Sequence, residues 1–519
     1  MISRDLAWSC LLRVILINST LQCPNHKSSD LKNLGEDVMQ KDRSRNVIFQ
    51  HAWLSFFIFS LVLFVVADSH ADPASCLNRN NGCAIPADFE GLSNPNQFFQ
   101  NTTNSVVKLI EEASDNDCNC LKLDSGIYEI SNANVNIPAN FHLRGTMEDG
   151  VPVSEISAVD IDSEAIRIRI RNPTTASYTI SRLLLRNVRI DMRGTGQIQP
   201  EMVDISRLVL FDTNYEGAQV QIDYVQDFEV SRNIFLRGQG FGGKGLKTDN
   251  SADGRISENC FGGRPDSDDE DGFCPNDYFN STMLSSLNLD DQGHFITAWN
   301  ASMGLADSRF DENWVKGNTN PNVYVRYLSK YSNRDHGIYV KFSNNISITE
   351  NRFEGWPPGA AHGHLKVRNA SKIRIRSNQI IGMHLDLRPS ITRATATQQV
   401  LGRPDWLVQS CTWIDENEFE GGSVSYDAVR KPARSDDEQI DAGIWVTGNT
   451  FSGSTIVVTE QETDYRIRRP ADDGIHTLGS YWKVRDNVRA NGGSAALFDT
   501  DLWISDSGSA DTWWNECSP

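Results

Sequence analysis

An asparagine follows an apolar strand residue at a distance of 13 positions at four places in this chain. The first two pairs repeat after 26 residues and the last two after 27: Val220 with Asn233, Leu246 with Asn259, Ile338 with Asn351, and Leu365 with Asn378. Short runs in which alternate residues are apolar, such as GIYVK and HLKVR, lie between these marks and predict strands. Strand, turn, strand, asparagine corner and strand at this period is typical of a parallel β-helix.

The asparagine at each corner has two physical explanations. Asn tolerates the left-handed backbone region, so we expect the asparagine itself to adopt that conformation. Stacked asparagines can also hydrogen-bond to one another from coil to coil. Because crossover connections between parallel strands are almost always right-handed, the sequence predicts an all-β, right-handed parallel β-helix over residues 126–490.

Residues 1–71 read as a leader with a signal peptide. Three basic residues (Lys41, Arg43 and Arg45) precede a 15-residue apolar run, Trp53 to Ala67, and a small-x-small site ends at Ala71. A membrane-spanning helix needs ~18 apolar residues or more, so an N-terminal anchor is the less favoured alternative. We therefore expect a secreted protein, extracellular or periplasmic, with no membrane attachment after cleavage.

The two ends of the predicted solenoid need covering, because a terminal coil otherwise exposes its apolar inward side chains. Residues 72–125 are the predicted N-terminal cap, with a short amphipathic helix at 105–114. Residues 491–519, which contain Trp503, Trp513 and Trp514, are the predicted C-terminal cap or tail. A loop insertion is expected at 262–294.

Eight cysteines remain after the leader, an even count that favours disulfides in an exported chain: Cys76, Cys83, Cys118, Cys120, Cys260, Cys274, Cys411 and Cys517. Cys260 and Cys274 bracket the insertion, and we expect them to pair. Cys118 and Cys120 are too close in the chain to bond readily to each other, so each is expected to find a distant partner.

The net charge of the chain restricts the class of partner that it can bind. The formal net charge is −19, and close to −20 without the leader, which makes nucleic acid an unfavourable partner. An acidic stretch at 265–272 offers hard oxygen ligands for Ca²⁺: Asp266, Asp268, Glu270 and Asp271. It lacks the glycine of an EF-hand loop, so a solvated, disulfide-tied loop is the favoured interpretation. We expect no required cofactor, with calcium as the alternative, and a monomer.

Strand alternation determines which side chains face outward. Ile338 and Val340 point inward, which leaves Tyr339 and Lys341 outside, and the next two coils align in the same way. Three outward columns follow: Tyr339, Lys366 and Asp386, extended through Gln221 and Lys247; Lys341, Arg368 and Arg388; and His364 with His384.

Stacked like charges repel, so folding alone gives little reason to place these cations together. An anionic ligand would compensate them, and we favour that interpretation. The alternative is that Lys and Arg simply decorate an exposed sheet.

The residue types suit β-elimination on a uronic-acid polymer. This reaction needs a cation for the carboxylate, a base for the C5 proton and an acid for the leaving oxygen. We expect Lys366 as the base and Tyr339 as its partner, with His364 as the alternative acid or base. Substrate-binding residues would be Arg368, Lys341, Arg388, His384 and Lys247.

The chain resembles the parallel β-helix polysaccharide lyases in two strings, HGIYVK and HGHLKVR. The residues that carry the resemblance are Tyr339, Lys341, His364, Lys366 and Arg368. The alginate-lyase and chondroitinase B-like families are the nearest in kind, and the architectural resemblance covers residues 126–490. It implies a lyase acting on an anionic, alginate-like polysaccharide, in some members with calcium. Alternatives stay open: a glycoside hydrolase or epimerase on the same fold, although no acidic trio and no DPHD string is found, or a non-catalytic carbohydrate-binding surface protein.

Overall fold

The computed structural model describes residues 83–89, 103–131, 133–159 and most of 166–504, with the longest gaps at 263–295, 317–335, 388–409 and 458–474. The chain divides into two units, Met1–Ala71 and Asp72–Pro519, and every described residue belongs to the second. The predicted leader, the four acidic residues of the calcium hypothesis, Cys274 and Arg388 therefore lie outside the described residues. Among the described helices, none is long and apolar enough to cross a membrane.

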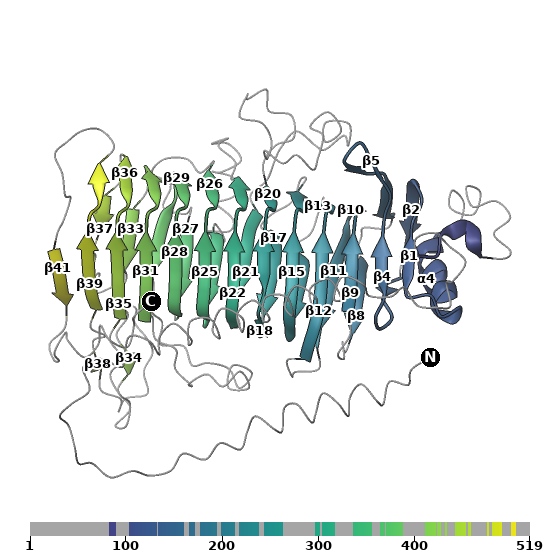
Figure 1. Cartoon of the computed structure of the whole chain (residues 1–519), viewed down its shortest axis with the longest axis horizontal. Helices are drawn as coiled ribbons and strands as arrows, with labels where there is room; N and C mark the ends of the chain where they lie inside the picture. Colours follow the sequence, from purple (N-terminus) through teal and green to yellow (C-terminus); the bar gives the residue numbers. More distant parts are fainter. Residues whose placement is uncertain are drawn as a thin grey trace, which may run out of the picture. The chain divides into compact units, whose positions relative to one another are not determined.

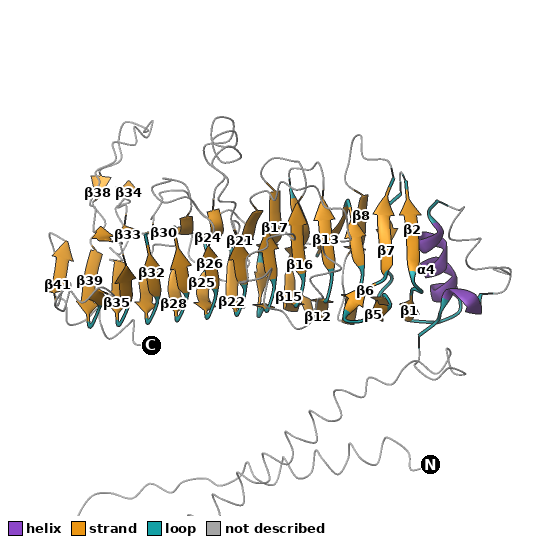
Figure 2. Ribbon diagram, turned by 90° about the horizontal axis from the view of Figure 1, so that it is seen from above, coloured by secondary structure: helices purple, strands orange, loops and turns teal. Residues whose placement is uncertain are grey.

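Three sheets of parallel strands wind into a right-handed parallel β-helix, as the sequence predicted (Figures 1 and 2). Each coil passes from sheet A through sheet B to sheet C before the next coil begins. Sheet A consists of β1 (Cys120–Lys122), β4 (His142–Arg144), β9 (Ser177–Ser181), β12 (Gln199–Ser206), β15 (Val225–Ser231), β18 (Ser251–Ala252), β19 (Arg255–Ser257), β22 (Leu305–Asp311), β25 (Asn344–Thr349), β28 (Ser371–Arg376), β31 (Ser410–Asp415), β35 (Ala442–Thr447), β39 (Ser480–Arg485) and β41 (Thr500–Ile504).

The other two sheets follow the same order along the axis. Sheet B consists of β2 (Gly126–Ile130), β7 (Ser154–Ala158), β10 (Leu184–Arg186), β13 (Val209–Asp212), β16 (Ile234–Arg237), β20 (Cys260–Gly262), β23 (Trp314–Lys316), β26 (Arg352–Glu354), β29 (Gln379–Ile381), β32 (Glu418–Glu420), β36 (Thr450–Ser452) and β40 (Val488–Arg489). Sheet C consists of β3 (Val135–Asn136), β8 (Ile166–Arg171), β11 (Val188–Arg193), β14 (Ala218–Asp223), β17 (Gly243–Asp249), β21 (Ile296–Ala301), β24 (His336–Lys341), β27 (His364–Arg368), β30 (His384–Leu387), β33 (Ser423–Tyr426) and β37 (Thr455–Val457).

One continuous core fills the solenoid with the inward side chain of every second strand residue. Ile338 is the register partner of Leu365 in the next coil, and both are fully buried, which confirms the predicted alignment. Aromatic residues stack in the same way along the axis. The rings of Phe419 and Phe451, for example, have centroids 4.9 Å apart and are nearly parallel. The strand spacing itself thus brings like side chains into contact.

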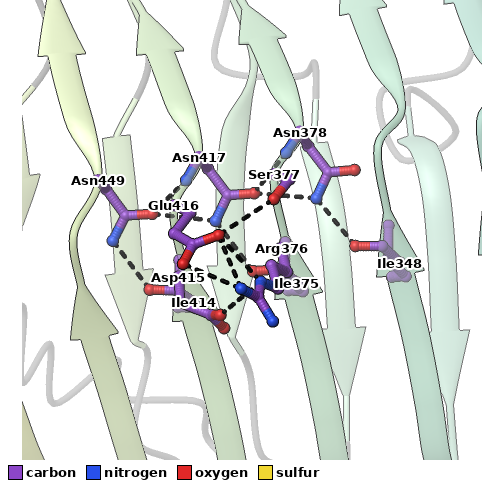
Figure 3. A network of polar contacts seen from close by, with 10 residues as sticks. All are labelled: Ile348, Ile375, Arg376, Ser377, Asn378, Ile414, Asp415, Glu416, Asn417 and Asn449. Carbon is purple, nitrogen blue, oxygen red and sulfur yellow. Dashed lines mark hydrogen bonds and ion pairs between the residues drawn. The ribbon is translucent and has the colours of Figure 1, made fainter.

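The corner between sheets A and B contains a continuous ladder of buried asparagines, each at most 2% exposed: Asn233, Asn259, Asn313, Asn351, Asn378, Asn417, Asn449 and Asn487. Each amide nitrogen except that of Asn487 donates to the amide oxygen of the next asparagine at 2.9–3.1 Å. Every one of them also donates to a backbone carbonyl of the preceding coil at 2.7–2.9 Å, and Figure 3 shows Asn378, Asn417 and Asn449. The predicted coil-to-coil hydrogen bonding is confirmed.

The expected conformation of these asparagines is wrong. The residue before each asparagine has the positive φ, such as Glu350 at 56° and Glu416 at 57°, while the asparagine itself does not. The sharp turn is thus made by an exposed residue, which leaves the asparagine amide free to point inward along the stack. The corner favours asparagine because the oxygen and the nitrogen of its amide can hydrogen-bond to groups in the neighbouring coils, as a buried amide requires.

The two ends of the described solenoid differ. At the N-terminal end, α4 (Ser105–Asp115) packs with buried Val106, Leu109 and Ile110, confirming the predicted amphipathic helix. The 3-10 helix η2 (Pro86–Asp88) precedes it, and the first sheet A strand, β1, already begins inside the predicted cap. At the other end, β41 pairs antiparallel with β39, whereas every other pairing in sheet A is parallel.

Small additions and disulfides complete the fold. Two short two-stranded sheets are formed by β5 (Met147–Glu148) with β6 (Val151–Pro152), and by β34 (Lys431–Pro432) with β38 (Ile475–His476). A disulfide joins Cys83 to Cys120, a distant partner as expected. Cys118, Cys260 and Cys411 are also disulfide-bonded. The predicted pairing of Cys260 with Cys274 remains a prediction, because Cys274 is outside the described residues.

The outward face of sheet B is apolar in the middle coils. A second buried cluster lies there, separate from the core, with every member at most 4% exposed: Leu184, Val209, Phe211, Ile234, Leu236 and Cys260. Register places these residues on β10, β13, β16 and β20, outside the solenoid. Side chains this buried cannot meet a polar ligand, so these four strands of sheet B do not form a binding face.

Candidate functional site

The outward face of sheet C carries the polar columns that the sequence predicted. Tyr339 is paired in register with Lys366, and Lys366 with Asp386, so these three stand in one column. The column extends backward through Asn300 to Lys247 and Gln221. Asn300 is the member that sequence reasoning missed. The inward residue of its coil, Trp299, lies 14 rather than 13 positions before the ladder asparagine Asn313, and this shift hid the coil.

Lys366 is not an uncompensated cation. Its Nζ lies 3.2 Å from Oδ2 of Asp386, with only 12% of the lysine side chain and 6% of the aspartate side chain exposed. The expected repulsion between stacked cations is therefore wrong at this position. A lysine held charged by a neighbouring carboxylate is a poor base, because the ion pair favours its protonated form. The pair is better suited to positioning than to removing a proton.

Lys341 lies in a partly buried environment next to another cation, Arg368. It stands beside Arg368 in the second column, and its Nζ lies 4.4 Å from the ring centroid of Phe342. Burial, and then the charge of Arg368, lower the pKa of Lys341 from 10.5 to about 8. A lysine with such a pKa is partly neutral near physiological pH, which is what a general base requires.

Arg368 completes this pair. Its Nε is buried and has no hydrogen-bond partner among the residues described. A buried guanidinium nitrogen without a partner is costly, and ligands or ordered water usually satisfy such a group. Arginine binds carboxylates in a two-pronged geometry. Arg368 therefore presents an unmet donor next to a lysine of lowered pKa.

Tyr339 and Asn300 belong to the outward column of sheet C next to the one that contains Lys341 and Arg368. Tyr339 is half-buried between Asn300 in the preceding coil and Lys366 in the following one. Asn300 is 7% exposed, and its Oδ1 is buried without a hydrogen-bond partner within the described part of the chain. Tyr339 thus stands between Asn300 and Lys366, while Arg368 is the register partner of Lys341 in the next column.

A third column contains histidines at three register positions: His336, His364 and His384. The sequence predicted the last two. His336 was missed because the register shifts between His336 and Ile338, which interrupts strict alternation. The repeated HG dipeptide in RDHGIY and AHGHLK was the signal that could have found it. His384 is half-buried, while the side chains of His336 and His364, and all of Arg388, are outside the described residues.

Carboxylates gather further toward the N-terminal end of the same face. Lys247, predicted as a substrate-binding residue, has its Nζ 2.5 Å from Oδ2 of Asp249. Asp249 is the register partner of Asp223, which accepts a hydrogen bond of 2.9 Å from Asn250. Burial, and then the charge of Asp249, raise the pKa of Asp223, although the Asn250 bond opposes this. No motif in the sequence indicates this acidic grouping.

Within the described ranges, no group of three or more His, Cys, Asp or Glu side chains could hold a metal ion. The acidic stretch proposed for calcium lies outside those ranges. Calcium binding by Asp266, Asp268, Glu270 and Asp271 thus remains a prediction.

Comparisons with known proteins concern the architecture. No protein-family model and no curated protein matches the chain. Similar solved structures include the A-module of mannuronan C-5 epimerase AlgE6 from Azotobacter vinelandii, 15% identical over 78% of this chain and 99% of that chain with a TM-score of 0.38. PfbA, a surface adhesin of Streptococcus pneumoniae, is 10% identical over 82% of this chain and 98% of that chain, with a TM-score of 0.39.

A third similar structure is tailspike protein 3 of bacteriophage CBA120, 11% identical over 80% of this chain and 62% of that chain with a TM-score of 0.28. At these identities and TM-scores the similarity concerns the fold alone. The chemistry of this chain has to be argued from its own residues.

Proposed function

We propose that this protein is a secreted lyase that cleaves a uronic-acid-containing polysaccharide by β-elimination. The observation that carries the proposal is the pair formed by Lys341, with its lowered pKa, and Arg368, with its unmet buried donor. An anionic sugar would compensate the charges of the two adjacent cations. The disulfide between Cys83 and Cys120 supports a location outside the cytoplasm.

The residues have distinct roles in this proposal. Arg368 binds the uronate carboxylate, which makes the neighbouring C5 proton easier to remove. Neutral Lys341 takes that proton, the released electron pair forms the C4–C5 double bond, and the C4–O bond breaks. Tyr339 donates a proton to the leaving oxygen. Lys366, paired with Asp386, keeps its charge and supports the position of Tyr339 rather than acting as the base.

This assignment replaces Lys366 by Lys341 as the favoured base. His364 and His384 remain alternative proton donors, because their register positions border the same surface. Asn300, whose Oδ1 is buried, is added as a neighbour that supports the position of Tyr339. Arg388 and Lys247 remain weaker candidates for substrate binding, the latter because Asp249 already neutralises it.

The test is an assay for unsaturated uronates, followed by their ultraviolet absorbance, on alginate, pectate, glucuronan and chondroitin. We expect one of these polymers to give the signal, at a rate that rises with pH through about 8 as Lys341 loses its proton. Lys341→Ala should lower the rate by roughly 10²–10⁴-fold. The matched control is Lys372→Ala, an exposed lysine on β28 of sheet A, which should retain full activity. Absence of an absorbing product from all four polymers would remove the lyase assignment.

A second candidate function is glycoside hydrolysis at Asp223 and Asp249. Hydrolysis needs two carboxyl groups in different environments, and the raised pKa of Asp223 beside an ion-paired Asp249 meets this condition. The side chain of Asp249 is only 3% exposed, however, which leaves little access for a substrate. New reducing ends without ultraviolet absorbance, lost in Asp223→Asn, would favour this function over the lyase.

A further inference from the structure

The sequence contains the acceptor motif for N-linked glycosylation, which is asparagine, any residue except proline, and then serine or threonine. The motif occurs at six places, which begin at Asn18, Asn101, Asn280, Asn300, Asn345 and Asn369. The structure describes two of these asparagines, Asn300 and Asn345. A glycan is bulky and needs room outside the folded chain, so the surroundings of each asparagine decide whether its motif is usable.

Asn345 lies where a glycan has room. It is the second residue of β25, and it is exposed. Its φ of 55° is in the left-handed region, which asparagine tolerates better than most residues. The same conformation recurs at Asp307 in the preceding coil and at Lys372 in the following coil, and both residues are exposed as well. Asn345 therefore belongs to a row of exposed side chains near the start of the sheet A strands.

The amide group of Asn345 is held by a neighbour in the preceding coil. Its Nδ2 donates a hydrogen bond of 2.6 Å to Oδ1 of Asp307. An asparagine amide carries two N–H groups. The bond to Asp307 uses one of them, and a bond to a sugar would replace the hydrogen of the other. The contact with Asp307 is thus compatible with a glycan on the same nitrogen.

Ser347, the third residue of this motif, is half-buried in the same strand. This burial does not prevent the transfer of a glycan, because the transferring enzyme acts on the chain before it folds. The enzyme meets the motif Asn345-Ile346-Ser347 as an accessible peptide. The folded protein has only to accommodate the product, which depends on the exposure of the asparagine.

Asn300 has the same kind of motif in opposite surroundings. It is 7% exposed, and in register it stands between Lys247 and Tyr339 on sheet C. A sugar on an amide this buried would displace the side chains that cover it. A chain with a glycan on Asn300 would therefore not reach this fold.

We propose that Asn345 is an N-glycosylation site and that Asn300 is not. The donor is an oligosaccharide whose first anomeric carbon is linked to a lipid pyrophosphate. The bond between that carbon and the pyrophosphate oxygen breaks, and a bond from the carbon to Nδ2 of Asn345 forms. The amide loses one proton, and the lipid pyrophosphate leaves with the electron pair.

The inference shares the secreted location with the proposed function, but it does not depend on a lyase reaction. The disulfide between Cys83 and Cys120 supports passage through an oxidising compartment, where such transfer takes place. A glycan on Asn345 would cover part of the outer side of sheet A with a bulky, hydrated group. Its expected effect is to raise the solubility of this part of the surface.

The experiment measures which asparagines carry a glycan. The full chain, with its own leader, is secreted from a eukaryotic cell line. A peptide N-glycosidase then removes the glycans in ¹⁸O-labelled water, which converts each glycosylated asparagine to labelled aspartate. Peptide fragmentation in a mass spectrometer locates the label. We expect it at Asn345 and not at Asn300, and a sample without the glycosidase controls for spontaneous deamidation.

A matched pair of variants tests the motif without touching the asparagine. Ser347→Ala removes the motif and keeps Asn345, whereas Ser347→Thr keeps the motif. We expect the label at position 345 to be lost in the first variant and retained in the second. The first variant should also migrate faster on a denaturing gel, by the step of one glycan. Circular dichroism checks that both variants have the fold of the parent.

Each outcome supports or overturns the inference. An unlabelled Asn345 in the secreted protein would overturn it, and so would a label at Asn345 that persists in Ser347→Ala. A label at Asn300 would overturn the second half and contradict its buried position on sheet C. A labelled Asn345 in a protein that cleaves no polymer would uphold the site and reject the lyase. An active lyase with an unlabelled Asn345 would reject the site alone.

Discussion

Two buried asparagines in this protein have opposite surroundings. Asn351, in the corner ladder, accepts from Asn313 and donates to Asn378 and to the carbonyl of Phe310, all within 2.8–3.1 Å. Asn300, on the outward face of sheet C, is 7% exposed and its Oδ1 has no partner among the described residues. The first amide is satisfied by the repeating fold. The second is buried at a cost that the fold itself does not offset.

The same contrast holds for two lysines in adjacent columns. Lys366 is paired with Asp386, whereas Lys341 stands beside the cation Arg368. Partnered polar groups hold this solenoid together, whereas in the proposed site Asn300 and Arg368 each have a buried polar atom without a partner among the described residues. The comparison predicts that removing a group of the first kind lowers stability, while removing one of the second kind lowers binding or catalysis.

The largest expected effect is on the ladder. Asn351→Leu removes the amide that bonds both neighbouring coils and leaves donors of Asn313 unsatisfied inside the corner. We expect the free energy of unfolding to fall by about 3–5 kcal/mol, since each orphaned group costs about 1–3 kcal/mol. Urea denaturation followed by circular dichroism measures the change. A loss below about 1 kcal/mol would mean that the ladder is not a main source of stability.

The next largest effect is on the buried ion pair. Lys366→Met removes the lysine that is ion-paired with Asp386, which is 4% exposed. We expect a loss of about 2–3 kcal/mol, somewhat less than for a fully buried pair, because the lysine end retains some exposure. Thermal unfolding of Lys366→Met alongside Asp386→Asn checks it, and Lys372→Met on the exposed face of β28 should be neutral.

A smaller effect with a pH signature is expected at Lys341. Its pKa is about 8 in the folded protein and 10.5 as the ordinary value, so the unfolded chain binds more protons between these limits. Stability should therefore rise as the pH increases from 8 to 10.5, and the deficit is fully present below pH 8. Lys341→Met should remove this rise and stabilise the protein by about 1 kcal/mol at pH 7, a figure reduced for the exposure of the side chain. Urea midpoints at pH 7 and pH 10 measure both quantities.

The smallest effect on stability is expected at Asn300. Asn300→Leu removes a buried acceptor that has no described partner, so the free energy of unfolding should change by less than about 1 kcal/mol. Activity on the uronate polymer should fall, because Asn300 is the register partner of Tyr339 and supports its position. The informative outcome is the difference from Asn351→Leu, since both changes replace a buried asparagine by leucine. Equal destabilisation of the two variants would remove the contrast on which these predictions rest.

Much of the fold could be predicted from local sequence alone. The 13-residue interval between an inward apolar residue and a ladder asparagine aligned Ile338 with Leu365, and period-two alternation put Tyr339, Lys366 and Asp386 in one column. These features depend only on the strand repeat, in which each residue faces inward or outward according to its parity. The pattern failed where one residue was added, as between Trp299 and Asn313, or where the register shifts, as after His336.

The chemistry of the face depended on contacts that parity does not specify. The predicted columns already put Asp386 beside Lys366 and Arg368 beside Lys341, but they do not tell how deeply each lysine is buried or that Lys341 Nζ lies against the ring of Phe342. Ion pairing and burial depend on side chains from several coils and on the segments that cover them, so the pKa of a lysine is a tertiary property. The sequence by itself determined the stacking of coils and the outward columns, because these follow from a short periodic pattern. Only the tertiary structure decided which outward groups are satisfied and which are left for a ligand, because a few ångströms between neighbouring coils separate the two cases.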